Sequence, residues 1–306
     1  MSDSTQLRPS FGIKTSPMHT TYEGIVSVWR AADATPEIEH AWLWDHMLPL
    51  AGDPAGPIYE GWTLLAALAA QTERVRLGLM VTAAPVRPPA VLAKMAATVD
   101  VISGGRLDLG IGVGATARRG PDGLPFHDAG VREYEAYGLP LVPPAEGVAR
   151  LAETCTIVER MWSEDVVDFD GRHYRLVGAR CEPKPVQRPR PPILIGGWGP
   201  RTLRVVAEHA DIWNTPGPPH VELGDIRERA RLLDEQCTSV GRDPAEITRS
   251  VQVIASPDDP AATRGALGEL IEAGFTHLVL GLVPPHTADS VHWAVDEVVG
   301  PVRAEL

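Results

Sequence analysis

Residues 87–114 read RPPAVLAKMAATVDVISGGRLDLGIGVG, and this stretch decides the fold. Residues 89–103 form a helical pattern that ends at a Gly-Gly pair, which is a typical helix stop. Residues 107–112 (LDLGIG) follow as a short apolar run of the kind that is buried on both faces of a parallel sheet. A similar run at residues 75–82 (VRLGLMVT) precedes the helix, so the stretch predicts a strand, a helix and a second strand.

The same alternation runs through the rest of the 306 residues. Further strands are predicted at residues 11–15, 40–45, 192–196, 210–214, 249–255 and 277–281. Further helices are predicted at residues 61–72, 146–162, 200–209, 225–240, 261–273 and 291–302. Strands that alternate with helices indicate a parallel barrel or a doubly wound sheet, and the strand count favours an α/β fold of the (β/α)8 TIM-barrel type. We expect residues 1–306 to form one barrel domain.

Two longer segments interrupt this alternation. Residues 115–144 follow the fourth predicted strand and are rich in Gly and Pro. Residues 169–191 precede the fifth strand and carry many prolines, with a small hairpin expected around Asp170 and Gly171. Loops that follow barrel strands lie at the carboxyl-terminal face, where active sites are built. We therefore expect the first insertion to lie near the functional site.

Composition excludes several classes of function. The net charge of −12 is spread along the chain, which argues against a nucleic-acid binder. Cys155, Cys181 and Cys237 show neither a CxxC pair nor zinc spacing, so no metal site is expected. No apolar run reaches the roughly eighteen residues of a spanning helix, and the polar first ten residues do not resemble a signal peptide. The sequence therefore predicts a cytoplasmic protein without membrane contact.

A polar pair, Asp45-His46, stands where the second predicted strand ends. Residues at this end of a barrel strand point into the mouth of the site. A histidine there can donate or accept a proton near neutral pH, so both residues are candidate catalytic residues. The alternative is that Asp45 caps a turn and His46 bonds a loop carbonyl.

Glycines mark the end of the fourth strand, at Gly112-Val113-Gly114. They leave backbone amides open to a flat ring or a phosphate, with tight barrel packing as the alternative. The spacing does not match GxGxxG, so a dinucleotide-binding fold is not supported.

A second glycine-rich strand end, IGGWGPRT at residues 195–202, runs into a predicted helix. Exposed amides and the helix dipole predict an anion site there, with a plain helix cap as the alternative. Its candidate binding residues are Gly196, Gly197, Trp198, Gly199 and Arg201.

Together these segments resemble the bacterial luciferase-like monooxygenase family and, within it, the F420-dependent oxidoreductases. The matching stretches occur in the expected order from about the first to the sixth strand: WLWDHMLPL, LAALAAQTERVRLGLMVT, RPPAVLAKMAATVDVISGGRLDLGIGVG, EAYGLP, FDGRHYRL, KPVQRPRPPILIGG and ADIWN.

The resemblance implies a flavin-type cofactor that lies across the mouth of the barrel. It implies that Asp45 and His46 lie near the ring, and that a non-proline cis peptide near the end of the third strand, at Met80–Val81, supports its back face. The remaining residues that it places at the cofactor are Thr82, Gly112, Val113, Gly114 and residues 196–201.

The resemblance favours coenzyme F420 over FMN, because the WDH pattern at residues 44–46 resembles F420 users. The implied function is hydride transfer between F420 and a small organic substrate, with His46 handling a proton or orienting the ring. Some F420-dependent sugar-phosphate dehydrogenases carry a glutamate where Ala115 stands, so that substrate type is not expected. The acidic tail of F420 would need a local basic patch, for which the candidates are Arg118, Arg119, Arg201 and Arg204.

Two other functions stay open. The first is an FMN monooxygenase that receives reduced FMN from a flavin reductase partner and activates oxygen. The second is a non-catalytic flavin-binding protein, since a fold does not fix a function. Members of the family are often dimers, so the resemblance also implies a homodimer.

Overall fold

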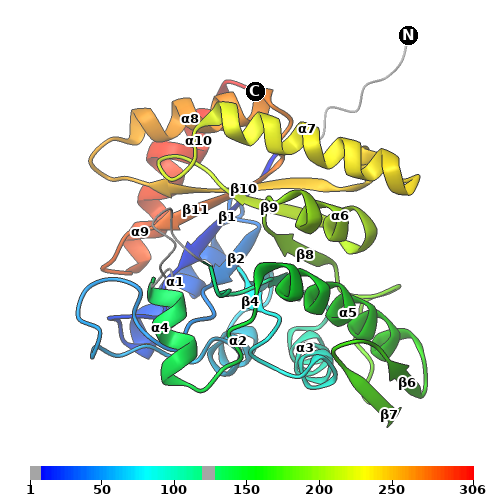
Figure 1. The fold of residues 1–306 in the computed structure, drawn as a ribbon. Helices are drawn as coiled ribbons and strands as arrows, with labels where there is room; N and C mark the ends of the chain where they lie inside the picture. The colour runs from blue at the N-terminus through cyan, green and yellow to red at the C-terminus, as the bar shows by residue number, and fades with distance from the viewer. Residues whose placement is uncertain (1–7, 119–127) are drawn as a thin grey trace.

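The computed structural model describes residues 8–118 and 128–306, and its main sheet is a nearly closed parallel barrel (Figure 1). The strands are β1 (Ser10–Thr15), β2 (His40–Leu43), β3 (Arg76–Leu79), β4 (Thr82–Ala83), β5 (Leu109–Gly112), β8 (Ile193–Gly196), β9 (Ile212–Pro216), β10 (Thr248–Ala255) and β11 (His277–Leu282). They pair in the order β3-β2-β1-β11-β10-β9-β8-β5-β4, and a bridge between Leu77 and Leu107 joins the two sides. Since β3 and β4 are successive parts of one predicted strand, these strands fill the positions of the expected (β/α)8 barrel.

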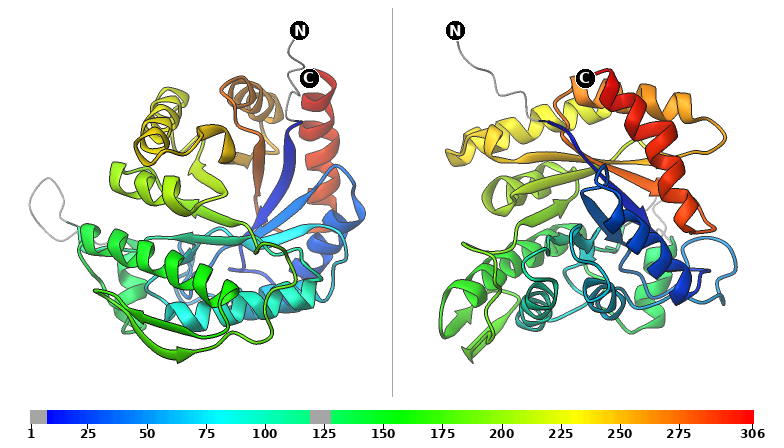
Figure 2. Two further views of the ribbon diagram at one scale, coloured as in Figure 1. Left: turned by 90° about the vertical axis from the view of Figure 1, so that its right-hand side faces the viewer. Right: turned by 180° about the vertical axis from the view of Figure 1, so that it is seen from behind.

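Helices cover the outside of the barrel, as both views of Figure 2 show. They are α1 (Tyr22–Ala34), α2 (Gly61–Ala69), α3 (Pro89–Ser103), α5 (Pro144–Ser163), α6 (Pro200–His209), α7 (Leu223–Val240), α8 (Pro260–Glu272), α9 (Ala288–Ala294) and α10 (Gly300–Ala304). Gly104 ends α3 in a left-handed conformation with a φ of 67°, where the sequence predicts the stop. No helix in the described ranges has both the length and the apolar character that crossing a membrane requires.

Two elements correct or extend the expected order. Helix α1 lies between the first two strands, where the sequence predicts no helix; its β-branched residues obscure a helical pattern of buried positions. Helix α4 (Ala129–Ala136) lies inside the insertion of residues 115–144, and Asp128 caps it by accepting from the amide of Val131 at 2.9 Å. The expected hairpin is confirmed: β6 (Val167–Asp170) pairs antiparallel with β7 (Arg175–Ala179).

The barrel interior combines a small apolar cluster with buried imidazoles. The apolar cluster consists of Trp42, Met80, Leu194, Ile212 and Val279. His40 and His277 stack beside it with ring centroids 3.8 Å apart, and burial lowers the pKa of both, to about 3 for His277. A Cβ atom on Gly12 would lie 1.8 Å from Nδ1 of His40, so the β1 position needs glycine.

Candidate active site

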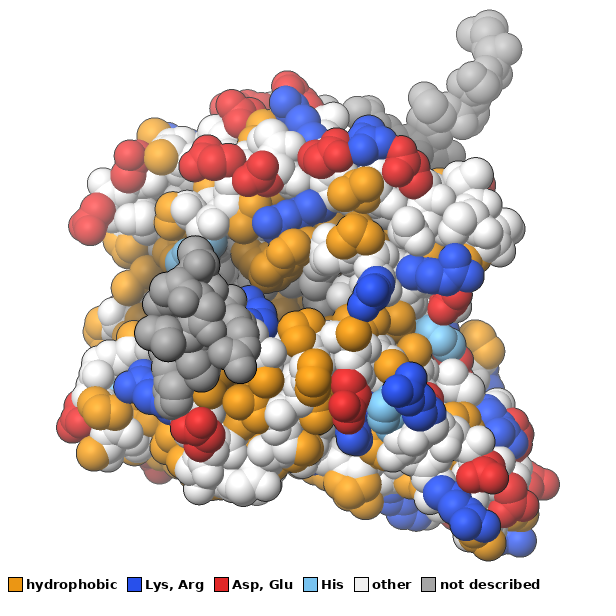
Figure 3. All heavy atoms as spheres, viewed as in Figure 1, with side chains coloured by type: hydrophobic (Ala, Val, Ile, Leu, Met, Phe, Trp, Pro, Cys, Tyr) orange, Lys and Arg blue, Asp and Glu red, His pale blue; other side chains and the backbone are white. Residues whose placement is uncertain are grey.

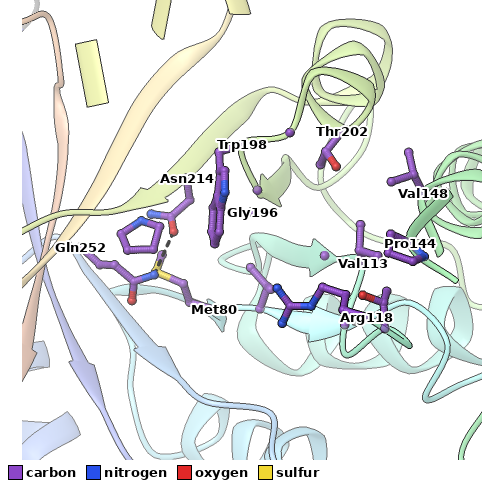
Figure 4. A pocket seen from close by; sticks show the side chains of 17 residues that line it. Met80, Val113, Arg118, Pro144, Val148, Gly196, Trp198, Thr202, Asn214 and Gln252 are labelled. Carbon is purple, nitrogen blue, oxygen red and sulfur yellow. Dashed lines mark hydrogen bonds between the residues drawn. The ribbon is translucent and has the colours of Figure 1, made fainter. Parts of the chain in front are cut away.

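A cavity of about 380 Å³ opens at the carboxyl-terminal ends of β3, β5, β8 and β9 (Figure 4). The surface is hollowed between α7 and the side that carries α4 and α5, and apolar side chains gather around the hollow (Figure 3). The lining residues are Met80, Val81, Gly112, Val113, Gly114, Thr116, Arg118, Pro144, Val148, Gly196, Gly197, Trp198, Gly199, Thr202, Asn214, Pro216 and Gln252. The cavity thus unites the three glycine-rich or apolar strand ends that the sequence singled out.

One wall of this cavity is made mainly of backbone, and we call Met80, Val81, Gly112 and Gly196 the glycine wall. The cis peptide expected at Met80–Val81 is confirmed. A Cβ atom would lie 2.8 Å from Cγ2 of Val81 if placed on Gly112, and 3.2 Å from Cγ1 of Val81 if placed on Gly196. Because such side chains are missing, the ends of β5 and β8 approach Val81 closely and add no side chain of their own at these two positions.

The start of α6 faces the same cavity. Gly197 has a φ of 148°, and a Cβ atom there would lie 2.7 Å from Cγ2 of Thr202. Gly199 caps α6 without a side-chain hydrogen bond, so the first-turn amides have no side-chain acceptor. Together with the helix dipole, this end of α6 can bind an anion. Thr202 lines the cavity, whereas the side chain of Arg201 is exposed and does not.

Asp45 is buried in an ion pair and does not line the cavity. Its Oδ2 lies 2.6 Å from Nη1 of Arg87, and its Oδ1 accepts from Nη2 at 2.9 Å. The hydroxyl of Thr82 also donates to Asp45, and Nε1 of Trp62 donates to that hydroxyl oxygen at 2.8 Å. These bonds fasten the segment after β2 to β4, and neither Asp45 nor Thr82 lines the cavity.

His46 lies in the same segment and contacts α4. Its Nδ1 is 3.0 Å from Oε2 of Glu133, a buried carboxylate that also accepts from the amides of Met47 at 3.1 Å and Leu48 at 3.4 Å. The imidazole is 34% exposed to solvent, and it does not line the cavity. The bond from Nδ1 to Glu133 fixes the orientation of the imidazole ring. It therefore also sets the direction in which Nε2 points.

The side chains of Asn214 and Gln252 line another side of the cavity, and Lys14 binds Gln252 from outside this lining. We call these three residues the polar wall. Nε2 of Gln252 donates to Oδ1 of Asn214 at 3.2 Å, the dashed line of Figure 4. Nζ of Lys14 donates to Oε1 of Gln252. Nδ2 of Asn214 donates to Oγ of Ser250 at 2.9 Å, and that hydroxyl lies 2.7 Å from Nδ1 of His277. The polar wall is therefore tied to the imidazole pair inside the barrel.

The predicted basic patch is only partly assembled. Arg118 lines the cavity and lies 3.3 Å from Asp128. Arg204 pairs with Glu208 at 3.0 Å on α6, and Arg119 lies outside the described residues. Arg229, which the sequence did not single out, packs over Trp198 with its guanidinium carbon 4.7 Å from the ring centroid.

Sequence reasoning missed Glu133 and most of the polar wall. Asn214 could have been suspected, because it ends a predicted strand. Lys14 and Gln252 lie in strands that carry other polar residues, so nothing local marks them, and Glu133 lies on a helix that was not predicted. Within the described part of the chain, no group of three or more His, Cys, Asp and Glu side chains can hold a metal ion.

Similar proteins include a phthiodiolone/phenolphthiodiolone dimycocerosates ketoreductase of Mycobacterium kansasii, which is 28% identical over 271 residues. The match covers 86% of this chain and 65% of the ketoreductase, so this chain spans less than two thirds of that relative.

Two solved structures share the barrel. An F420-dependent secondary alcohol dehydrogenase in complex with an F420-acetone adduct has a TM-score of 0.79 and 16% identity, and the match covers 96% of this chain and 99% of the other. A riboflavin lyase with modified FMN and riboflavin has a TM-score of 0.77 and 14% identity, with 97% and 92% covered. The model of the family described as luciferase-like monooxygenase matches residues 11–291. The protein therefore belongs to the luciferase-like monooxygenase family.

Proposed function

We propose that this protein is an oxidoreductase that transfers a hydride between coenzyme F420 and a small organic substrate. The glycine wall is the observation that carries the proposal. A flat tricyclic ring fits against a surface to which Gly112 and Gly196 add no side chain, and a Cβ atom on either glycine would crowd Val81. The start of α6 lies in the same cavity and can bind the phosphate group of the side chain that is attached to such a ring.

Cations near the cavity favour F420 over FMN, because the F420 tail carries several negative charges. Arg118 belongs to the cavity lining, and Arg229 packs over Trp198, another lining residue. The names of two similar proteins, a ketoreductase and an F420-dependent alcohol dehydrogenase, are consistent with hydride chemistry.

F420, when bound, would supply a ring carbon that gives or takes a hydride. The glycine wall would support one face of the ring, and the first-turn amides of α6 would bind the phosphate. His46 is the proposed proton-handling or ring-orienting residue, and Glu133 positions it through the bond at Nδ1. Asp45 acts through the ion pair with Arg87, which fixes the segment that carries His46.

Two parallel assays test this function. In the first, the protein is mixed without oxygen with reduced F420 and a panel of small ketones and unsaturated compounds. In the second, it is mixed with reduced FMN in air. We expect F420 oxidation that requires a panel compound, and no oxygen uptake above background. Oxygen uptake with reduced FMN and no F420 oxidation would instead identify an FMN monooxygenase.

A matched pair of variants tests the role of His46. His46→Ala should lower turnover by about 100-fold, the lower range for a lost general acid or base, and leave the circular dichroism spectrum unchanged. His209→Ala removes a similar pair, in which Nδ1 lies 3.1 Å from Oε2 of Glu159 away from the cavity, and should keep full turnover. Equal turnover in both variants removes His46 from the mechanism.

A further inference from the structure

A second cavity, of about 320 Å³, adjoins the first at the barrel mouth. The side chain of Gln252 lines both cavities, so they meet at the polar wall. Most of the second cavity is apolar, with walls formed by Met18, Trp44, Val253, Leu282, Val283 and Pro284. A molecule bound there would lie next to whatever occupies the first cavity.

Lys14 brings a positive charge into this apolar space. Its Nζ donates to Oε1 of Gln252 and lies 5.3 Å from the ring centroid of Trp44. Among the described residues that line the second cavity, His220 is the other titratable group, and no carboxylate is present. The charge therefore faces a neutral amide, an indole ring and apolar side chains, and it lacks an acidic partner within the described ranges.

Burial lowers the pKa of the Lys14 amine to about 8. An amine in this range is populated in both protonation states near neutral pH, so it can give up a proton and regain it. A surface lysine would hold its proton too tightly for such a role.

We propose that Lys14 binds and protonates the oxygen of an apolar carbonyl compound held in the second cavity. The substrate class is then a ketone or aldehyde in the reducing direction and the matching alcohol in the oxidising direction. This inference rests on the proposed function, because reduced F420 is the hydride donor. The two residues then have separate roles. His46, which bonds Glu133, acts on the cofactor ring, and Lys14 acts on the substrate oxygen.

The step balances as follows in atoms and electrons. The carbonyl carbon accepts the hydride with its two electrons, and the π bond to oxygen breaks. The electron pair of that bond moves to oxygen, which takes a proton from the ammonium of Lys14. Lys14 is left as a neutral amine and regains a proton from water. The reverse sequence oxidises the alcohol and leaves Lys14 protonated.

The first test needs no cofactor. The chain has three lysines, Lys14, Lys94 and Lys184, so limited reaction with an amine-selective reagent can be followed at each of them by mass spectrometry. We expect the reactivity of Lys14 to rise with a midpoint near pH 8. Cyclohexanecarboxylate, an apolar anion that cannot be reduced, should protect Lys14 and leave the other two unchanged. Identical profiles at all three lysines, with no protection, would overturn the inference.

The second test compares variants on ketones from acetone to cyclohexanone with reduced F420. Lys14→Met should lower kcat/KM by about 100-fold while F420 affinity stays within about twofold of the parent. Lys14→Arg keeps the charge but holds its proton, so it should recover part of the KM and little of kcat. In the parent, kcat/KM for ketone reduction should fall above about pH 8.

The outcomes separate the two proposals. If the parent binds no F420, the proposed function fails. The labelling experiment, which needs no cofactor, then decides alone whether Lys14 forms a binding site. If the parent binds F420 and Lys14→Met reduces each ketone as well as the parent does, the inference about Lys14 fails alone. Reduction confined to carbon–carbon double bonds would overturn the carbonyl substrate class.

Discussion

The two walls of the mouth differ in what they are made of. The glycine wall presents backbone from the link between β3 and β4 and from β5 and β8, and only Met80 and Val81 add side chains to it, whereas the polar wall presents an amine and two amides from β1, β9 and β10. A surface made of backbone favours a ligand with a flat face. Side chains that form hydrogen bonds favour a ligand with a polar atom at one particular position. The comparison teaches that one mouth can select a ligand in two ways, by the space that missing side chains leave and by hydrogen bonds.

Weakening the ion pair of Asp45, which holds the segments beside the glycine wall together, should give the largest change in free energy. Asp45→Asn removes the charge that pairs with the buried Arg87 and accepts from Thr82 of β4. We expect the free energy of unfolding to fall by about 3 kcal/mol, because Arg87 loses its buried carboxylate partner and keeps Glu60, which is 39% exposed. Urea denaturation measures this change. The same substitution at Asp234, whose pair with Arg249 is more exposed, should cost less than about 1 kcal/mol.

Adding a side chain to the glycine wall should come next. Gly196→Val places branched carbons beside Val81 at a position where even a Cβ atom would lie 3.2 Å away. We expect F420 affinity to fall by at least about 100-fold, which is about 2.7 kcal/mol, with the fold retained. Gly268→Ala on α8 is the control, since no atom lies within 4 Å of its added Cβ. It should keep affinity and raise stability by about 0.5–1 kcal/mol.

Acid should weaken the support of the polar wall. The pKa of His277 in the folded chain is about 3, below the value of about 6.5 in the unfolded chain. Its contribution to the free energy of unfolding is therefore fully present above pH 6.5 and decreases as the pH falls toward 3. Between pH 7 and pH 5 this one group should cost about 2 kcal/mol of unfolding free energy. His277→Asn should remove that share of the pH dependence in urea titrations.

Breaking the polar wall itself should give the smallest effect. Gln252→Leu keeps the shape of the side chain but removes the bonds to Lys14 and Asn214. We expect KM for a ketone to rise about tenfold, which corresponds to about 1.4 kcal/mol, and F420 affinity to change by less than about threefold. Gln71→Leu at an exposed position should alter neither value. A Gln252→Leu variant that lost F420 binding and kept KM would reverse the assignment of the two walls.

The sequence predicts the glycine wall far better than the polar wall for a physical reason. Runs such as GIGVG at residues 110–114 are local signals, and the cis peptide at Met80–Val81 follows from the family resemblance. Lys14 and Gln252 lie 238 residues apart, and only the barrel register brings them together: Lys14 and Ile254 both pair with Gly281. No local pattern marks such a meeting of single polar residues.

The pair Asp45-His46 shows the same limit within one motif. The sequence predicts both residues at the mouth; in the structure neither lines the first cavity, since Asp45 is buried and His46 is 34% exposed outside the lining. Their partners, Arg87 and Glu133, are 42 and 87 residues further along the chain, and these partners decide which side chain supports the fold and which one remains accessible. Since α4 was not predicted, the bond to Glu133 could not be foreseen.

The most direct test of the central claim is a binding titration with F420 and FMN, each oxidised and reduced, followed by tryptophan fluorescence. Trp198 lines the cavity and is 48% exposed, so Trp198→Phe should remove much of the signal change and identify the site. The account predicts micromolar binding of F420 and clearly weaker binding of FMN. Tighter binding of reduced FMN, or binding of neither cofactor, would contradict it.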